Sequence, residues 1–409
     1  MGLAKLVCTG CSCLCDDIEV DSQGSHITRI ENACVKGASL LYAGDNLERR
    51  APFAVEGRKV PIEQAIEKAA HLLQEAGKVL IFGLDNCTLE AQAVGIGLAQ
   101  ALGAVIDDVS SFSHGVLVQA ILDGHIPTCS FAEVENADLL IYWGSNPYHS
   151  HPRHLSKFSY YSHKKWDEAG WIPQVVISCV EVRDTETSSL CRPVFEVEPG
   201  GDRDFIGKIL AAIRDKDETQ ESKAFVELVR NSAFCVIFVG LGLIYALDND
   251  FHFFKEMLHE LSRWTRFAVI PMLGHFNTLG FNRLLFEKTG HVNKVSFANG
   301  VSYGDEFSFL EQMRNRVPDC VLIAGSDPFS SQPRSLMRNL EGVPIICLDP
   351  FVTPTTMAAE VVFGTAVSGL ETAGKAIRMD GIVVSLLQGR EPEIPTDEEI
   401  LRQLLNRIG

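Results

Sequence analysis

The chain has 409 residues and a formal net charge of −17 at pH 7, with 46% hydrophobic and 22% charged residues. This length allows two or three domains with their own cores, and the negative charge argues against nucleic acid as a partner. No apolar run approaches the ~18 residues of a membrane-spanning helix and no signal peptide is visible, so we expect a cytoplasmic protein with reduced thiols and no membrane contact.

The first feature along the chain is a group of cysteines. Cys8, Cys11 and Cys15 form a C-x2-C-x3-C run, and Cys34 follows a short loop later. Four thiolates at such spacing can each bind one iron of a [4Fe–4S] cluster. A zinc site is an alternative, although zinc sites usually use paired C-x2-C units and the second pair is missing. Buried thiols without metal are the other alternative, and Cys13 is interpreted as a bystander.

Residues 1 to about 55 show no strong helical period. Residues 16–20 and 26–30 alternate apolar and polar side chains, which predicts a small hairpin beside the cysteines. From Pro61 onward the pattern changes, because apolar side chains between Ile62 and Leu73 recur at helical spacing. The sequence therefore predicts a small N-terminal subdomain followed by a helix.

Strands and helices then alternate to the end of the chain. Residues 78–83 read as a buried strand, Thr88 opens a helix that runs through Ala101, and residues 105–107 form the next strand. This alternation predicts an α/β fold in which helices flank parallel sheets.

Two segments resemble each other in sequence. Residues 139–147 and 321–328 are both apolar strands that run into Gly-Ser-Asn/Asp-Pro, and residues 235–240 form a third strand ending in glycine. Ligands of parallel sheets bind at the carboxyl ends of strands, so the repetition suggests two related lobes facing one cleft. Simple recurrence of a common strand-to-helix turn is the alternative.

Four segments are expected along the chain. They are an iron–sulfur subdomain at 1–55, an α/β lobe at 56–165, a second α/β lobe at 166–350 and a C-terminal segment at 351–409 that returns to the cleft. The stretch from Phe158 to Pro173 is rich in aromatic and charged residues, which predicts an exposed loop or a surface against another chain.

Two histidine motifs could carry chemistry. His149, His151 and His154 could bind a metal, but Pro152 interrupts a helix there, so a hydrogen-bonding loop or a cofactor-site wall is preferred. The pair Ser113-His114 precedes an apolar helix. Adjacent side chains rarely face each other and the G-x-S-x-G elbow is absent, so serine hydrolase chemistry is not expected.

Two loops after strands carry polar groups. Gly274 and Gly280 permit close backbone approach beside His275, which is typical of a binding loop or of a structural turn. The stretch Thr353–Thr356 offers hydroxyls and amides that could hold an anion or cap a helix.

Taken together, these stretches resemble the B subunit of formylmethanofuran dehydrogenase and of the related formyltransferase/hydrolase complex. The resemblance covers nearly the whole chain. The matching pieces are Cys8–Asp17, Asn32–Cys34, Glu90–Gly95, Tyr142–Pro147, His151–His154, Ile270–Met272, Gly274–His275, Gly280–Asn282 and Thr353–Thr356.

The resemblance implies a molybdopterin-oxidoreductase-like fold. In the dehydrogenase, this subunit holds a [4Fe–4S] cluster and a tungsten or molybdenum bis-pterin, and it interconverts CO2 and formate. By this resemblance the cluster ligands here are Cys8, Cys11, Cys15 and Cys34. If a pterin binds, the residues implied are Gly144, Ser145, Asn146, His151, Gly274, His275, Thr353, Thr355 and Thr356.

The departures from the family pattern bear on function. Ser113 stands where the dehydrogenase has its metal-binding cysteine before a histidine, here His114, and Leu273 stands where it has an active-site arginine. An apolar side chain cannot pair with formate. We also match the family's strand-ending Asp-Pro-Arg to residues 178–180, and its Pro-His-Arg to residues 350–352, so that Val180, Phe351 and Val352 would replace anion-binding groups.

These departures predict a non-catalytic, scaffold-type B subunit. The complex would carry formyl from formyl-tetrahydromethanopterin to a methanofuran-type carrier and hydrolyse it to formate, using an amidohydrolase-like A subunit, a formyltransferase-like D subunit and a C subunit. A [4Fe–4S] cluster is expected, whereas the tungsten or molybdenum bis-pterin is not, and no catalytic or pterin-binding residues are expected. The alternatives are an active tungsten or molybdenum dehydrogenase subunit and an electron-transfer module that uses the cluster alone.

Overall fold

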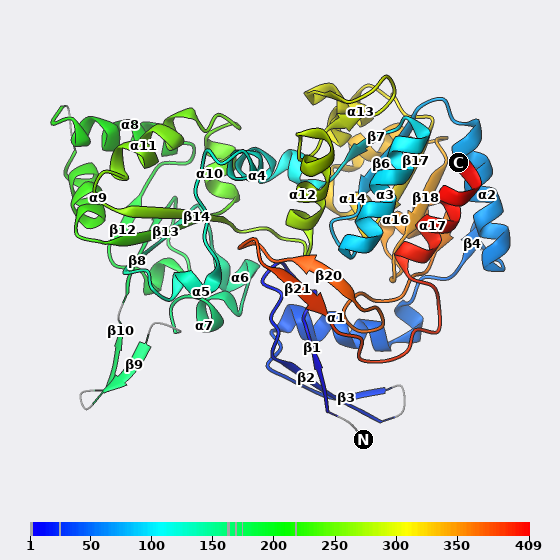
Figure 1. The fold of residues 1–409 in the computed structure, drawn as a ribbon, viewed down its shortest axis with the longest axis horizontal. Coiled ribbons are helices and arrows are strands. Elements are labelled where there is room, and N and C mark those ends of the chain that lie inside the picture. Colours follow the sequence, from blue (N-terminus) through cyan, green and yellow to red (C-terminus); the bar gives the residue numbers. More distant parts are fainter. Residues whose placement is uncertain (1–2, 24–25, 162–163, 168–169, 174, 217–218) are drawn as a thin grey trace. The chain divides into compact units, whose positions relative to one another are not determined.

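The computed structural model describes residues 3–23, 26–161, 164–167, 170–173, 175–216 and 219–409. The chain forms two compact units (Figure 1). Unit 1 comprises Met1–Phe112, His275–Arg378 and Val383–Gly409, and unit 2 comprises Ser113–Gly274 and Met379–Ile382. These limits differ from the four consecutive segments expected from the sequence, because the chain leaves unit 1 after Phe112 and returns to it at His275.

Unit 1 is built on a mixed sheet. Within the described residues its strands follow the order β16-β15-β7-β6-β17-β18-β19-β4-β5, and the strands from β7 to β19 are parallel. The bounds are β4 Ala54–Val55, β5 Arg58–Lys59, β6 Val79–Gly83, β7 Val105–Asp107, β15 Val295–Ser296, β16 Ser302–Tyr303, β17 Cys320–Ala324, β18 Ile345–Leu348 and β19 Val361–Phe363. Every residue of β6 and of β17 is buried, as expected for parallel strands covered on both faces.

Helices surround this sheet in unit 1. They are α2 Ile62–Glu75, α3 Leu89–Leu102, α12 Thr278–Thr289, α13 Phe309–Arg314, α14 Pro328–Ser331, α15 Arg334–Met337, α16 Pro354–Ala358 and α17 Asp397–Ile408, whereas α1 Val35–Asp45 packs against the small N-terminal sheet. The predicted helix after Pro61 is α2. The helix predicted to open at Thr88 is α3, whose first turn is capped because the Thr88 hydroxyl accepts from the Ala91 N–H. Helix α17 packs against α3 and α2, so the C-terminus of the chain completes this core (Figure 1).

Two small antiparallel sheets complete unit 1. The first consists of β1 Leu3–Leu6, β2 Ile18–Gln23 and β3 His26–Glu31, and β2 with β3 forms the predicted hairpin. The second consists of β20 Gly374–Ile377 and β21 Val383–Leu386. An apolar cluster that includes Leu14, Phe276, Ala376 and Leu386 joins the cysteine loop to the second small sheet.

Unit 2 contains a fully parallel sheet in the order β12-β11-β8-β13-β14 within its described residues. The bounds are β8 Leu139–Trp143, β11 Val176–Glu181, β12 Val194–Glu196, β13 Phe234–Val239 and β14 Arg266–Pro271. The first strand, β8, lies in the middle, with the next two strands on one side and the last two on the other. The direction of the chain crossings therefore reverses beside β8, which is where ligands of such sheets bind.

The helices of unit 2 are α4 Gly115–Leu122, α5 Phe131–Val134, α6 Pro147–Ser150, α7 His154–Lys157, α8 Asp202–Ile213, α9 Gln220–Arg230, α10 Leu241–Ala246 and α11 His252–Leu261. Trp143 is central to this core and contacts Phe205, Phe225 and Phe254. The predicted surface at 158–173 contains a short hairpin, β9 Lys164–Asp167 with β10 Gly170–Pro173. Residues 162, 163, 168 and 169 lie outside the described residues, so its role remains a prediction.

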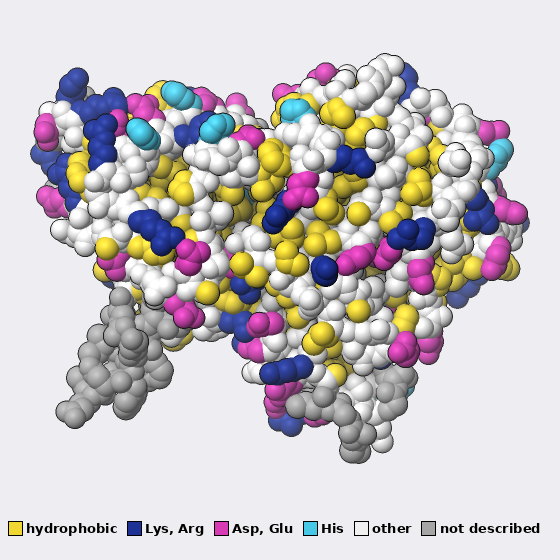
Figure 2. Space-filling view, viewed as in Figure 1, with side chains coloured by type: hydrophobic (Ala, Val, Ile, Leu, Met, Phe, Trp, Pro, Cys, Tyr) yellow, Lys and Arg dark blue, Asp and Glu magenta, His cyan; other side chains and the backbone are white. Residues whose placement is uncertain are grey.

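The surface is mixed in charge. On the face shown in Figure 2, Lys and Arg side chains lie among Asp and Glu side chains over both units. Within the described residues, no helix is both long enough and apolar enough to cross a membrane.

Candidate functional site

The sequence repetition is also a repetition of structure. After β8, Gly144 adopts a φ of 56°, and after β17, Gly325 adopts a φ of 58°, a left-handed conformation that favours glycine. Each glycine is followed by serine, by Asn146 or Asp327, and by a proline that opens a short helix, α6 or α14.

A threonine hydroxyl stabilises each of these turns by hydrogen bonds. It comes from the loop after the neighbouring strand, which is β11 in unit 2 and β18 in unit 1. The Thr187 hydroxyl donates to Asn146 Oδ1 at 2.6 Å, and the Thr355 hydroxyl donates to Asp327 Oδ1 at 2.6 Å. Each threonine oxygen also accepts a backbone N–H two residues after the Asn or Asp, from Tyr148 at 3.4 Å and from Phe329 at 3.2 Å. We call each such arrangement a threonine clamp.

The capping that surrounds the two clamps matches as well. Thr185 with Ser188, and Thr353 with Thr356, each exchange hydrogen bonds between side chain and backbone N–H. A strand-to-helix turn that merely recurs would not also carry the same threonine clamp and the same capping residues in the loop after the neighbouring strand. The two units therefore share one structural module, which consists of the turn, the clamp and the caps. Thr353 therefore caps the N-terminus of α16. Helix capping is one of the two roles, beside anion binding, that the sequence allowed for residues 353–356.

The structure corrects one alignment made from the sequence. Ser178, Cys179 and Val180 lie inside β11, paired with β8 on one side, and Val180 is fully buried. The strand ends at Glu181, so Arg183 lies in the loop that follows it and is exposed. A buried apolar run does not mark where a strand ends, which is why the match of the family's strand end to residues 178–180 was wrong. Val180 is therefore no evidence that a cation was lost.

A pocket of about 290 Å³ lies in unit 2 at the carboxyl ends of β8 and β11. Gly144 and Gly242 line it together with two acids, Glu181 and Asp202. Asp202 Oδ1 accepts from the Trp143 indole N–H at 2.8 Å, and burial raises the pKa of both acids. The sequence reasoning missed these acids. The available signal was the Pro-Gly-Gly-Asp stretch at 199–202 that opens α8 after a strand.

Ser113 and His114 lie in unit 2 at the start of α4. The His114 ring is buried and its Nε2 is 3.2 Å from the Val239 carbonyl oxygen, to which it donates. Burial lowers the pKa of His114 to about 4, so the ring is neutral at pH 7. With Nε2 donating to the backbone, the unprotonated nitrogen of the neutral ring is Nδ1, and the absence of serine hydrolase chemistry stays a prediction from the sequence.

Leu273 is an apolar residue that is shielded from solvent. Its side chain is 1% exposed, and its backbone carbonyl accepts from His151 Nε2 at 2.6 Å. His151 Nδ1 lies 2.9 Å from the Ser150 hydroxyl. His151 therefore fixes the backbone of the loop after β14, and the neighbouring Gly274 is exposed.

The three histidines of the 149–154 motif do not converge. His149 is exposed and pairs with Glu186 at 3.0 Å. His154 is fully buried among aromatic rings, and neither ring nitrogen has a hydrogen-bond partner within the described residues. Burial, with a smaller contribution from His151, lowers the pKa of His154 to about 3. The three rings therefore make separate contacts, and His151 forms hydrogen bonds within its loop, while a role as the wall of a cofactor site stays a prediction.

In unit 1, His275 and Asp85 form an ion pair through Nδ1 and Oδ2. Asp85 follows β6 and is fully buried, and its Oδ1 has no partner within the described residues. Burial lowers the pKa of His275, but the Asp85 carboxylate raises it by more, so the net pKa lies above its ordinary value. When protonated, the half-buried ring can donate from Nε2 to an anionic or carbonyl group. Sequence reasoning named His275 but missed Asp85, which is 190 residues away.

The cysteine loop also belongs to unit 1. Lys36 lowers the pKa of both Cys11 and His275 by its charge. A hydrogen bond from Cys13 is the main cause that lowers the pKa of Cys11 to about 7, against burial, which raises it. Thiolate character of this kind suits a metal ligand.

The four predicted cluster ligands fit a metal centre in part. Cys8, Cys11 and Cys15 are buried in one loop, and Cys34 is the half-buried N-cap residue of α1. A Cβ at Gly37 would lie 2.6 Å from Cys8 Sγ, so this glycine leaves room for the sulfur. The donor chemistry suits iron or zinc, but among the described residues no three or more His, Cys, Asp or Glu side chains are already grouped around a metal position.

Comparisons with known proteins agree with this architecture. No family model matches the chain. Two curated relatives are named as the B subunit of tungsten-containing formylmethanofuran dehydrogenase 2. The protein from Methanocaldococcus jannaschii is 31% identical over 430 residues, which is 99% of this chain and 98% of the relative. The protein from Methanococcus maripaludis is 30% identical with the same coverage.

Solved structures show the fold. The formyltransferase/hydrolase complex FhcABCD from Methylorubrum extorquens, in complex with methylofuran, matches with a TM-score of 0.71 at 20% identity, covering 87% of this chain and 98% of that chain. Acetylene hydratase from Pelobacter acetylenicus matches with a TM-score of 0.61 at 12% identity, covering 99% and 69%. The predicted α/β, molybdopterin-oxidoreductase-like fold is confirmed. With about 30% identity over almost its full length, the chain belongs to the family of formylmethanofuran dehydrogenase B subunits.

Proposed function

We propose that this chain is a scaffold-type B subunit of a formyltransferase/hydrolase complex and carries no redox chemistry of its own. The complex would move formyl from formyl-tetrahydromethanopterin to a methanofuran-type carrier and hydrolyse it to formate in the cytoplasm. The chemistry would lie on amidohydrolase-like A and formyltransferase-like D subunits, assembled with a C subunit. Family membership and the likeness to FhcABCD support this assignment.

Leu273 is the observation that carries the proposal. At this position the resemblance implies an arginine that pairs with formate, whereas here the side chain is apolar and 1% exposed. A buried leucine offers no charge-assisted contact, and loss of one preorganised donor costs ~3–4 kcal/mol of transition-state stabilisation. Redox chemistry on formate would therefore lack its main electrostatic support.

Ser113 points in the same direction. The resemblance implies a cysteine or selenocysteine ligand for tungsten or molybdenum at this position, and a serine oxygen is a harder, less polarisable ligand. The neighbouring His114 is buried, neutral at pH 7 and bonded to a backbone carbonyl. No catalytic residue for CO2 or formate chemistry is therefore proposed in unit 2.

The four cysteines are proposed to keep a [4Fe–4S] cluster as a structural cross-link. Cys8, Cys11 and Cys15 would hold three irons and Cys34 the fourth, and the cluster would tie the N-terminal loop to α1. The low pKa of Cys11 favours metal binding at neutral pH. In this arrangement Cys13, whose pKa is raised by the hydrogen bond with Cys11 and by burial, remains a protonated bystander.

Elemental analysis of the anaerobically purified chain tests the proposal. Iron near four atoms per chain, with tungsten and molybdenum below a tenth of an atom, is the expected result. About one tungsten or molybdenum per chain, together with extractable pterin, would overturn it.

An active tungsten or molybdenum dehydrogenase subunit with serine at the metal is the second candidate. Both curated relatives are named as tungsten-containing, and both threonine clamps are intact. Arg183 also remains in the loop after β11, where a pyrophosphate contact would need a cation. Formate oxidation by the purified complex, together with the metal, distinguishes this candidate from the scaffold.

A further inference from the structure

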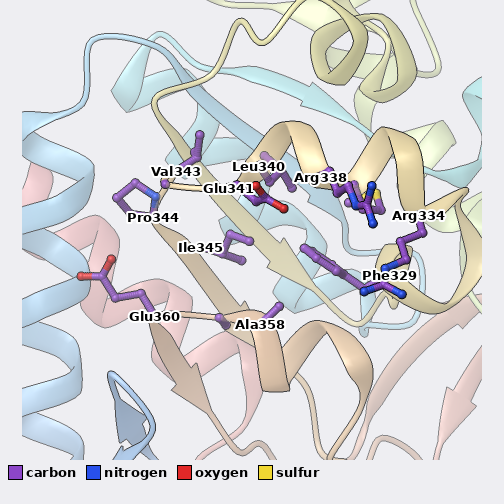
Figure 3. A pocket seen from close by; sticks show the side chains of 13 residues that line it. Phe329, Arg334, Arg338, Leu340, Glu341, Val343, Pro344, Ile345, Ala358 and Glu360 are labelled. Atoms are coloured by element: carbon purple, nitrogen blue, oxygen red, sulfur yellow. The ribbon is translucent and has the colours of Figure 1, made fainter.

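A groove of about 500 Å³ crosses the surface of unit 1 between α15 and α16. Its floor is apolar and is formed by Met337, Leu340 and Ile345, each 4% exposed, near the start of β18. Figure 3 shows Arg334 and Arg338 at one end, beside Phe329, and Pro344 and Glu360 at the other.

The charges in this groove are unbalanced. Arg334 and Arg338 are exposed, and within the described part of the chain neither guanidinium has a carboxylate partner. Glu360 is already paired with Lys68 at 2.8 Å. Glu341 also lines the groove, but it forms no ion pair there with either arginine. Two free guanidiniums in a chain of net charge −17 form a site for carboxylates, which arginine binds through paired hydrogen bonds.

Exposed apolar residues extend beyond the groove. Met357 is 78% exposed and precedes Ala358, which lines the groove, and Val352 is 45% exposed in the loop before α16. A small ligand confined to the groove would leave both residues in water. Arginine, methionine and aromatic side chains are enriched at protein–protein interfaces, and this surface offers all three.

We infer that this groove is a docking surface for another subunit of the complex. The docking segment presents carboxylates to Arg334 and Arg338, places an apolar side chain on the floor of the groove, and covers Met357. This inference rests on the proposed function only in assuming that the chain works inside a multi-subunit assembly.

Charge reversal tests this inference. The chain is produced together with the A-, C- and D-type subunits of its own source, and assembly is followed by native mass spectrometry and by dissociation constants from biolayer interferometry. The double variant Arg334→Glu, Arg338→Glu is expected to weaken association at least tenfold. The matched control, Arg58→Glu with Arg407→Glu, changes the net charge equally on exposed positions outside the groove and is expected to assemble as the wild type does.

Each outcome decides the inference. The inference is overturned if the groove variant binds the other subunits with unchanged affinity while its circular dichroism spectrum and melting temperature equal those of the wild-type chain. Equal weakening by the control variant would also overturn it, because the effect would then be one of general charge. The purified chain is also tested for binding of 1-anilinonaphthalene-8-sulfonate. If this dye binds only when both arginines are present, and the groove variant still assembles normally, the groove is a small-anion site and the inference is overturned. Tungsten in the complex would overturn the proposed function without affecting this test.

Discussion

His154 combines full burial with two unpartnered ring nitrogens among the described residues. Its ring centroid lies 4.6 Å from that of Phe238 and 5.8 Å from that of Tyr142, so the environment is aromatic. An unsatisfied buried polar group costs ~1–3 kcal/mol of stability. The sequence grouped His154 with two other histidines, and spacing alone could not show that it points into the core.

We therefore expect His154→Phe to raise the free energy of unfolding by about 1 kcal/mol at pH 7, because it removes two unpaired polar atoms. The control His154→Ala leaves a cavity and is expected to lower it by about 2–4 kcal/mol. Urea denaturation followed by circular dichroism measures both. A phenylalanine variant as unstable as the alanine variant would show that the ring nitrogens have a partner.

The variant Leu273→Arg tests whether this buried apolar site can accommodate the arginine that the family resemblance implies. A guanidinium placed at a site that is 1% exposed loses its hydration, so we expect a loss of at least ~3 kcal/mol of stability and no gain of tungsten, even when combined with Ser113→Cys. Leu273→Met is the volume-matched control and is expected to cost less than about 1.5 kcal/mol. Thermal unfolding and metal analysis measure the outcome. A stable arginine variant that oxidises formate would contradict the scaffold assignment.

The two threonine clamps are elements whose similarity allows a paired experiment. Thr355→Val removes the hydroxyl that bridges Asp327 and the Phe329 N–H, and Thr187→Val does the same at Asn146 and Tyr148. We expect each to cost ~1–2 kcal/mol, with the larger cost at Asp327 because its acceptor is a carboxylate.

Hydrogen–deuterium exchange resolves the two effects. Thr355→Val should increase exchange in residues 325–331, and Thr187→Val in residues 144–150, with little change in the other loop. Thr→Ser at either position keeps the hydroxyl and serves as the control. Equal changes in both loops for either variant would show that the clamp is not a local element.

Apolar periodicity was sufficient to predict many individual elements. The predicted hairpin, the helices α2 and α3 and the strands β6 to β8 all appear, because each depends on local pattern and capping such as that of Thr88. The order of the strands was not predictable, since β6 pairs with β17 from the other end of the chain. The end of β11 was also misplaced, because every residue from 177 to 180 is buried and nothing local marks the boundary.

Over the whole molecule, the sequence predicted family and fold but not the division of the chain. Unit 1 is assembled from three separate segments, and this returning path leaves no compositional signal. Individual site residues such as His275 could be named from motifs. Their partners could not, because Asp85 reaches His275 through the packing of β6 and not through spacing.

The two units should respond to pH in opposite directions. In unit 2, the pKa values of His114 and His154 are lowered to about 4 and about 3, so the neutral rings stabilise the fold above pH 6.5, and this stability is lost as the pH falls. In unit 1, burial raises the pKa of Asp349 to about 7, and those of Asp107 and Asp397 to about 6. Those carboxyls favour the protonated form, so their contribution to stability is lost as the pH rises.

Between pH 7.5 and pH 5, we therefore expect unit 2 to lose about 2 kcal/mol for each of the two histidines, offset in part by Glu181 and Asp202, whose pKa burial raises, while unit 1 gains a similar amount from its buried carboxyls. Hydrogen–deuterium exchange at the two pH values, corrected for intrinsic exchange rates, measures this for peptides of each unit. His154→Phe should remove about half of the loss in unit 2 and leave unit 1 unchanged. Parallel changes in both units would mean that the buried groups of at least one unit titrate normally, because water reaches the core of that unit.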